Sequence, residues 1–144
     1  MKRIVSIAAV FLCGISLLQA QLLRVSDALK ELKMENISVV ENKETITVAF
    51  ETSTYRGIYN GIGIAISHLV AIPEIPTLQL LILDNALPQL CITIPAELIQ
   101  RYQSGEYALD EVYRNMAMTT STKTAVHRLK GVKREESSFG KVDL

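Results

Sequence analysis

The alternation of apolar and polar positions divides the first half of the chain into a helix, a strand pair and a second helix. Within residues 22–34, the apolar side chains fall at i, i+3, i+4 and i+7, which is the spacing of one helix face: Val25, Ala28, Leu29 and Leu32. Residues 37–40 are β-like and are followed by the polar turn 41–44. Residues 45–52 then alternate strictly, with Ile46, Val48 and Phe50 on one face. This period of two predicts a hairpin with one buried face.

A glycine-rich helix is predicted next, over residues 55–71. Gly57 and Gly61 stand four positions apart in it and would share one helix face. Glycine costs about 1 kcal/mol relative to alanine inside a helix, so its use there needs a reason. We expect a close approach between the helix backbone and the sheet.

The second half repeats the strand-pair pattern. Residues 78–83 are almost wholly apolar and predict a central strand, and residues 87–94 predict its partner. Pro95 suits the first position of a short helix over residues 96–103, and residues 106–114 could form another. The order helix, hairpin, helix, hairpin predicts an α+β fold, a two-layer sandwich with a four-stranded sheet and helices on one face. Strand order is left open.

The composition changes after Asn115. Residues 117–137 are rich in Thr, Ser, Lys, Arg and Glu, and they lack the apolar surface needed to offset the entropy of ordering. We therefore expect a flexible linker there, and a polar tail over residues 115–144. Its basic side chains would be solvated or make a weak surface contact: Lys123, Arg128, Lys130, Lys133 and Arg134.

The first 20 residues have the layout of a secretory signal peptide. Lys2 and Arg3 precede the apolar run 4–18, and Ala20 stands before an expected cut at Gln21. The alternative is a membrane anchor, but the run is shorter than the roughly 20 residues that span hydrocarbon. The predicted organisation is a signal peptide (1–20), an α+β domain (21–114) and the tail. The mature chain is expected to be exported and to hold no transmembrane helix.

Charge and cysteine content restrict the function further. Removing residues 1–20 takes away two of the fifteen Lys and Arg and none of the fifteen Asp and Glu, which leaves a formal charge of −2. A near-neutral chain has no electrostatic footprint for nucleic acid. Cys91 would be the single remaining cysteine, so no intramolecular disulfide can form.

No residue pattern predicts catalysis. His68 and Cys91 are the one thiol–imidazole combination in the core region, and nucleophilic chemistry would require them in hydrogen-bond reach. Cys91 lies on an apolar predicted strand, where a cysteine acts as a small hydrophobic residue. His68 and His127 are far apart in the sequence, so we expect no metal and no cofactor. A small hydrolase is kept as a remote alternative.

The clearest binding candidates lie where the first hairpin meets the central helix: Tyr55, Arg56, Tyr59 and Asn60. Two aromatic rings four positions apart would share a helix face, beside an arginine and an amide. Such a group can stack on and hydrogen-bond a sugar, or anchor a protein partner. The structural alternative is that these side chains attach the hairpin to the helix.

The same residues carry a family resemblance. The segments VAFETSTYRG, LQLLILDNALPQLCITIP and LIQRYQSGE, with the glycine-rich helix, resemble the periplasmic α/β part of YjbH-type proteins over residues 22–114. Those outer-membrane proteins serve exopolysaccharide and capsule export in Gram-negative bacteria. The closing SFGKVDL is similar to the lead-in to the family's β-barrel. The chain departs from the family in having no barrel sequence and no lipobox.

The resemblance implies a non-enzymatic interaction domain in the periplasm or at the periplasmic face of the outer membrane. Its expected partners are export components or the polysaccharide itself, and the chain could be a truncated family member. The alternative is a free-standing periplasmic binding or assembly module unrelated to polysaccharide. The resemblance names no ligand and no oligomeric state.

Overall fold

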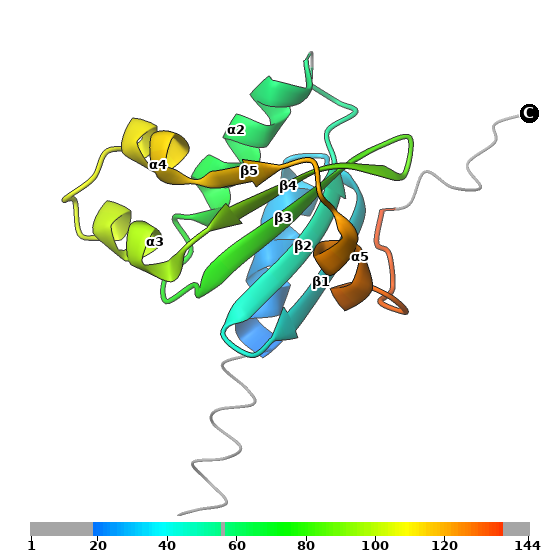
Figure 1. Ribbon diagram of the computed structural model, residues 1–144, viewed down its shortest axis with the longest axis horizontal. Helices are drawn as coiled ribbons and strands as arrows, with labels where there is room; N and C mark the ends of the chain where they lie inside the picture. The colour runs from blue at the N-terminus through cyan, green and yellow to red at the C-terminus, as the bar shows by residue number, and fades with distance from the viewer. Residues whose placement is uncertain (1–18, 56, 137–144) are drawn as a thin grey trace, which may run out of the picture.

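One mixed sheet runs through the molecule, with the strand order β1-β2-β3-β4-β5 (Figure 1). The computed structural model describes residues 19–55 and 57–136, so most of the predicted signal peptide lies outside the described residues. The strands are β1 (Glu35–Asn42), β2 (Thr45–Glu51), β3 (Thr77–Asp84), β4 (Leu87–Ile94) and β5 (Ala117–Thr119). The mixed α+β class is confirmed, and the predicted number of four strands is wrong, because β5 comes from the stretch expected to be linker.

Both predicted hairpins form, and the inner strand of one pairs in parallel with the inner strand of the other. β1 pairs antiparallel with β2, and β3 pairs antiparallel with β4. β2 pairs parallel with β3. A parallel pair needs a crossover connection, and α2 (Ile58–Leu69) provides it.

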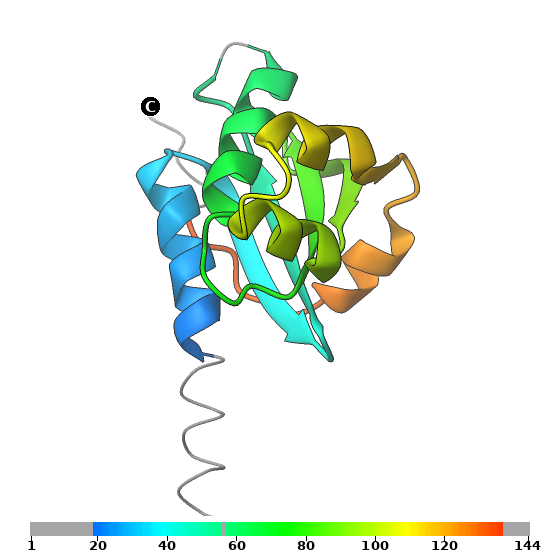
Figure 2. The ribbon, with the colours of Figure 1, turned by 90° about the vertical axis from the view of Figure 1, so that its left-hand side faces the viewer.

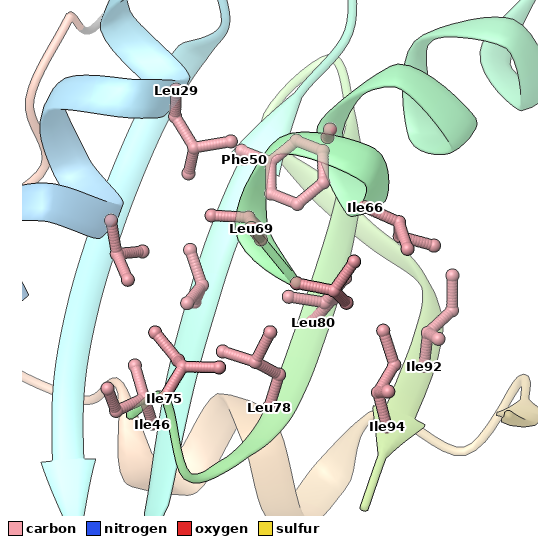
Figure 3. Packing of buried hydrophobic residues seen from close by; sticks show 14 of the residues in the cluster. Leu29, Ile46, Phe50, Ile66, Leu69, Ile75, Leu78, Leu80, Ile92 and Ile94 are labelled. Carbon is pink, nitrogen blue, oxygen red and sulfur yellow. The ribbon is translucent and has the colours of Figure 1, made fainter. Parts of the chain in front are cut away.

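Four helices cover one face of the sheet, here called the front face (Figure 2). They are the N-terminal helix (residues 19–31), α2, α3 (Ala96–Gln103) and α4 (Leu109–Asn115). The main core lies beneath them, and its side chains come from alternate strand positions and from the helices (Figure 3). Phe50, Leu80 and Ile92 contribute from three neighbouring strands and are fully buried. The predicted period of two is confirmed here.

The opposite face is here called the back face, although Figure 1 shows it turned toward the viewer, and it is covered as well. α5 (Lys123–Arg128) lies across it, and Ala125 and Leu129 contact a second buried cluster formed by Ala49, Leu81, Leu83 and Cys91. The prediction of helices on one face is therefore wrong. The physical reason is that Ala49, Leu81, Leu83 and Cys91 form an apolar patch on the back face, and strands with apolar residues on a second face are stable when that face is covered too.

Residues 117–136, here called the C-terminal strap, join the two edges of the four main strands. β5 pairs with β4, with Thr93 opposite Ala117. Past α5, Glu135 forms an antiparallel bridge with Ile37 of β1. Residues expected to form a flexible linker therefore pair with the sheet and cover its back face, and residues 137–144 lie outside the described part of the chain.

The central helix starts later than predicted. Gly57 has φ of 80° and stands at the N-cap, so the helix begins at Ile58. Gly57 therefore does not share a helix face with Gly61. The predicted close approach is confirmed at Gly61, where an added Cβ would lie 2.5 Å from Cβ of Thr52.

Candidate functional site

The hairpin–helix junction brings together the ends of β2 and β3 and the start of α2. Because β2 and β3 are parallel, with Glu51 opposite Leu83, the C-terminal ends of both strands lie at the same end of the sheet. A groove of about 340 Å³ lies there. Its lining defines what we call the junction groove: Glu51, Thr52, Ser53, Ile58, Leu83, Asp84 and Asn85.

The structure separates the binding residues predicted from sequence. Tyr55 is half-buried and contacts the main core, which agrees with the structural alternative for this side chain. Tyr59 is 75% exposed, and Asn60 is also exposed. The two tyrosines do not share a helix face, because Tyr55 precedes the first helical residue. Arg56 lies outside the described residues.

A buried carboxylate shapes the junction groove. The side chain of Glu51 accepts hydrogen bonds from the backbone N–H groups of Asn85, at 2.7 Å, and Ala86, at 3.2 Å. It also accepts one from Nδ2 of Asn36, at 2.7 Å. Asn85 and Ala86 both have positive φ, 50° and 63°, as a tight two-residue hairpin turn requires. Glu51 therefore holds the β3–β4 turn in place, as a buried charge must be hydrogen-bonded.

The groups left at the groove surface suit a hydroxyl-rich ligand. Asp84, Asn85 and Ser53 are exposed there, and they offer a carboxylate, an amide and a hydroxyl. Both ionisable side chains of the lining are acidic, so the local field disfavours an anion. The groove can accept and donate hydrogen bonds, and the exposed Tyr59 follows Ile58 of its lining in the chain.

The thiol–imidazole pair does not form. His68 is exposed in the last turn of α2, on the front face. Cys91 is buried in the cluster of the back face. The sheet separates the two side chains, so His68 cannot activate this thiol.

The surroundings of Cys91 keep it protonated. Burial raises the pKa of the Cys91 thiol, and a hydrogen bond with Gln79 and the charge of Arg128 oppose that rise. Gln79 is itself held, because its Oε1 accepts from the hydroxyl of Thr47 at 3.0 Å and from Arg128 at 2.9 Å. A thiol with a raised pKa is a poor nucleophile at neutral pH.

A second hollow lies on the back face, and sequence reasoning missed it. This back groove has a volume of about 530 Å³ between the sheet and the C-terminal strap. Lys123, Lys130 and Arg134, expected to belong to a solvated linker, line it. The available signal was the spacing of Ala125, Leu129 and Val132 at i, i+4 and i+7, a short apolar stripe within a polar stretch.

Within residues 19–55 and 57–136, no three side chains of His, Cys, Asp or Glu come together in a way that could hold a metal ion. Of the helices in the described part of the chain, none combines the length and apolar character needed to cross a bilayer. No family model, no curated protein and no solved structure matches the chain.

Proposed function

We propose that the chain is an exported, non-enzymatic interaction domain of surface exopolysaccharide export, acting in the periplasm or at the periplasmic face of the outer membrane. The observation that carries the proposal is the exposed ring of Tyr59, 75% accessible, in the first turn of α2, directly after Ile58 of the groove lining. Its partner would be the polysaccharide or an export component.

The chemistry of the junction suits a sugar. An exposed aromatic ring offers a face for stacking, and its hydroxyl can reach a polar partner. The junction groove, at about 340 Å³, falls within the size range of about 300–1,000 Å³ for small-ligand sites. Asp84 and Asn85 add hydrogen-bonding groups at its surface.

The resemblance to YjbH-type proteins concentrates at the same place. The segment VAFETSTYRG contains Glu51, Thr52 and Ser53 of the groove lining. The segment LQLLILDNALPQLCITIP contains Leu83, Asp84 and Asn85. Both sides of the junction groove are thus built from segments that resemble the export family.

The test is a binding titration of the mature chain by isothermal calorimetry with two probes, an acidic bacterial exopolysaccharide and a neutral glucan. The neutral glucan should bind more tightly, because both ionisable side chains of the groove lining are acidic. Tyr59→Ala should weaken binding by up to about tenfold, the size of one lost aromatic contact. Leu23→Ala is the matched control, since Leu23 is a 60% exposed apolar residue of the N-terminal helix, and neither it nor its chain neighbours line the junction groove. Equal affinity of Tyr59→Ala and wild type would reject the junction as the sugar site.

Export is tested independently of binding. Expression of the full chain in a Gram-negative host should give a periplasmic protein whose mass corresponds to a start at Gln21, because Ala20 ends the predicted signal peptide. A chain that keeps Met1 and stays in the membrane fraction would favour the anchor alternative.

A further inference from the structure

The back groove has an apolar floor and apolar sides. Ala49, Leu81 and Leu83, from β2 and β3, form the floor, and each is less than 5% exposed. Val126 and Leu129 line it from the C-terminal strap. At about 530 Å³ the groove lies inside the range of about 300–1,000 Å³ typical of small-molecule sites.

The charges around this floor are all of one sign. Lys123, Lys130 and Arg134 line the groove and are exposed, and His127 lies with them. The lining contains no Asp or Glu. None of the three cationic side chains forms an ion pair with a carboxylate of residues 19–55 or 57–136. Uncompensated positive charge beside a low-dielectric wall attracts an anion more strongly than the same charge in water.

The strands of the floor have no open edge that could hydrogen-bond an added peptide strand. β2 is hydrogen-bonded to β1 and β3, and β3 is hydrogen-bonded to β2 and β4. Both are interior strands, so no open edge is present for an added strand. Recognition in this groove must therefore come from apolar contact along the floor and from charge at the rim.

We propose that the back groove binds a single-chain anionic amphiphile, a long-chain carboxylate, with its alkyl tail between the floor and Val126 and Leu129 of the C-terminal strap and its carboxylate among Lys123, Lys130 and Arg134. An alkyl tail matches the apolar side chains of the floor, beside which Ser38 is the one polar side chain that the described strands of the sheet contribute to the lining. A carboxylate matches a rim that carries cations and no anion. This site is distinct from the junction groove in charge and in ligand class, although Leu83 lines both.

The probe is laurate, titrated into the mature chain below its micellar concentration and detected by displacement of a fluorescent fatty acid. We expect saturable binding that tightens from octanoate to decanoate to laurate by roughly twofold to fourfold per methylene, the effect of burying each group. Dodecanol, which has the same tail without the charge, should bind more weakly.

Two double variants with equal loss of charge test the rim. Lys123→Gln with Lys130→Gln should weaken laurate binding by roughly threefold to tenfold, the size of two lost exposed charge contacts. Arg24→Gln with Lys43→Gln is the control, because both side chains are exposed and neither lines the back groove. Val126→Glu places an anion in the groove from a residue that is 41% exposed, and it should abolish binding while far-UV circular dichroism stays unchanged.

Three results would overturn the proposal. The first is absence of saturable laurate binding to the wild-type chain. The second is equal affinity of the two double variants, or of laurate and dodecanol, since charge at the rim would then play no part. The third is displacement of the fluorescent probe by an acidic amphipathic peptide and not by laurate, which would assign the groove to a protein partner.

Discussion

The contact between Gly61 and Thr52 determines how closely α2 can approach the end of β2. An added Cβ at Gly61 would lie 2.5 Å from Cβ of Thr52, 2.9 Å from its Cγ2 and 3.0 Å from its Oγ1. Thr52 is only 6% exposed, and its Cβ is fixed to the backbone, so the neighbour cannot rotate away. Gly61→Ala therefore forces the helix and the strand apart.

Two terms of opposite sign set the cost of this substitution. Overpacking a filled contact destabilises by about 1–3 kcal/mol. Replacing glycine with alanine inside a helix stabilises by up to about 1 kcal/mol. Gly61→Ala should therefore lower the free energy of unfolding by up to about 2 kcal/mol, and Gly61→Leu by more, because its side chain is larger.

Gly63 supplies the matched control in the same helix. A Cβ added there would meet only the hydroxyl of Tyr113, at an ordinary contact distance of 3.8 Å. Gly63→Ala gains the same helix propensity without the clash, so it should stabilise by up to about 1 kcal/mol. The difference between the two variants isolates the steric term, and urea unfolding of the mature chain measures both.

The reasoning fails if the two alanine variants unfold at the same urea concentration. A double-mutant cycle gives a second check, because Thr52→Gly removes the Cβ that clashes. In that background Gly61→Ala should lose its penalty, so the two substitutions should be non-additive. If the effects of the two substitutions on the free energy of unfolding are additive, the cost of Gly61→Ala does not come from its contact with Thr52.

The remaining predictions concern the C-terminal strap and Cys91. A chain ending at Asn115 should unfold at least about 2 kcal/mol more easily than a chain ending at residue 136, because the apolar back face loses its cover; equal stabilities would show that the strap does not dock. The Lys30 ammonium, whose Nζ lies 2.8 Å from Oε2 of Glu135, and the hydroxyl of Ser26 lower the pKa of Glu135 below its ordinary value of 4.5. This carboxylate therefore stabilises the fold above pH 4.5, and the stabilisation is lost as the pH falls through its folded pKa. The unfolding midpoint of Glu135→Gln should thus be below that of wild type at pH 7, and the difference should shrink as the pH falls below 4.5, whereas a difference that stays constant would assign the effect to something other than ionisation. Cys91 should react slowly with iodoacetamide in the folded chain and rapidly in urea, since burial raises its pKa; fast reaction without urea would contradict its burial.

The sequence predicted the central elements well because their periodicity is strong. Residues 45–52 alternate, and residues 78–83 are apolar except for Gln79, and both form strands at the predicted positions. The apolar run also held information that the prediction of helices on one face did not use. A strand with apolar residues at successive positions is buried on both faces, and Leu81 and Leu83 are indeed covered on the back face.

The C-terminal strap could not be predicted in the same way, because its stabilising contacts are few and distant in sequence. β5 has three residues, and all are exposed, so its side chains carry no burial pattern. α5 buries one residue, Ala125, within its bounds. Its stability comes from partners far away, such as Gln79 with Arg128. Composition suggests disorder in such a segment, and tertiary contacts override it.

The first hairpin and the central helix meet where the sequence predicted, but the boundary of α2 depended on the positive φ of Gly57. With the helix starting at Ile58, Tyr55 contacts the core and Tyr59 remains exposed. The sequence places Glu51 in a predicted strand, but nothing in its neighbours predicts that its carboxylate will contact the turn at Asn85.

The strap also explains why the sheet has two different grooves. Its first residues pair with β4 and its last described residues pair with β1, so it crosses the back face from one edge of the four main strands to the other. Its short helix α5 and the residues after it cover Leu81 and Leu83, and the back groove is the hollow that remains between the strap and the sheet. The junction groove instead lies at the ends of the parallel strands, where the strap contributes none of the lining. A ligand in the back groove would therefore be linked to docking of the strap, since it binds the docked form alone, whereas a sugar at the junction would depend on the hairpins and α2.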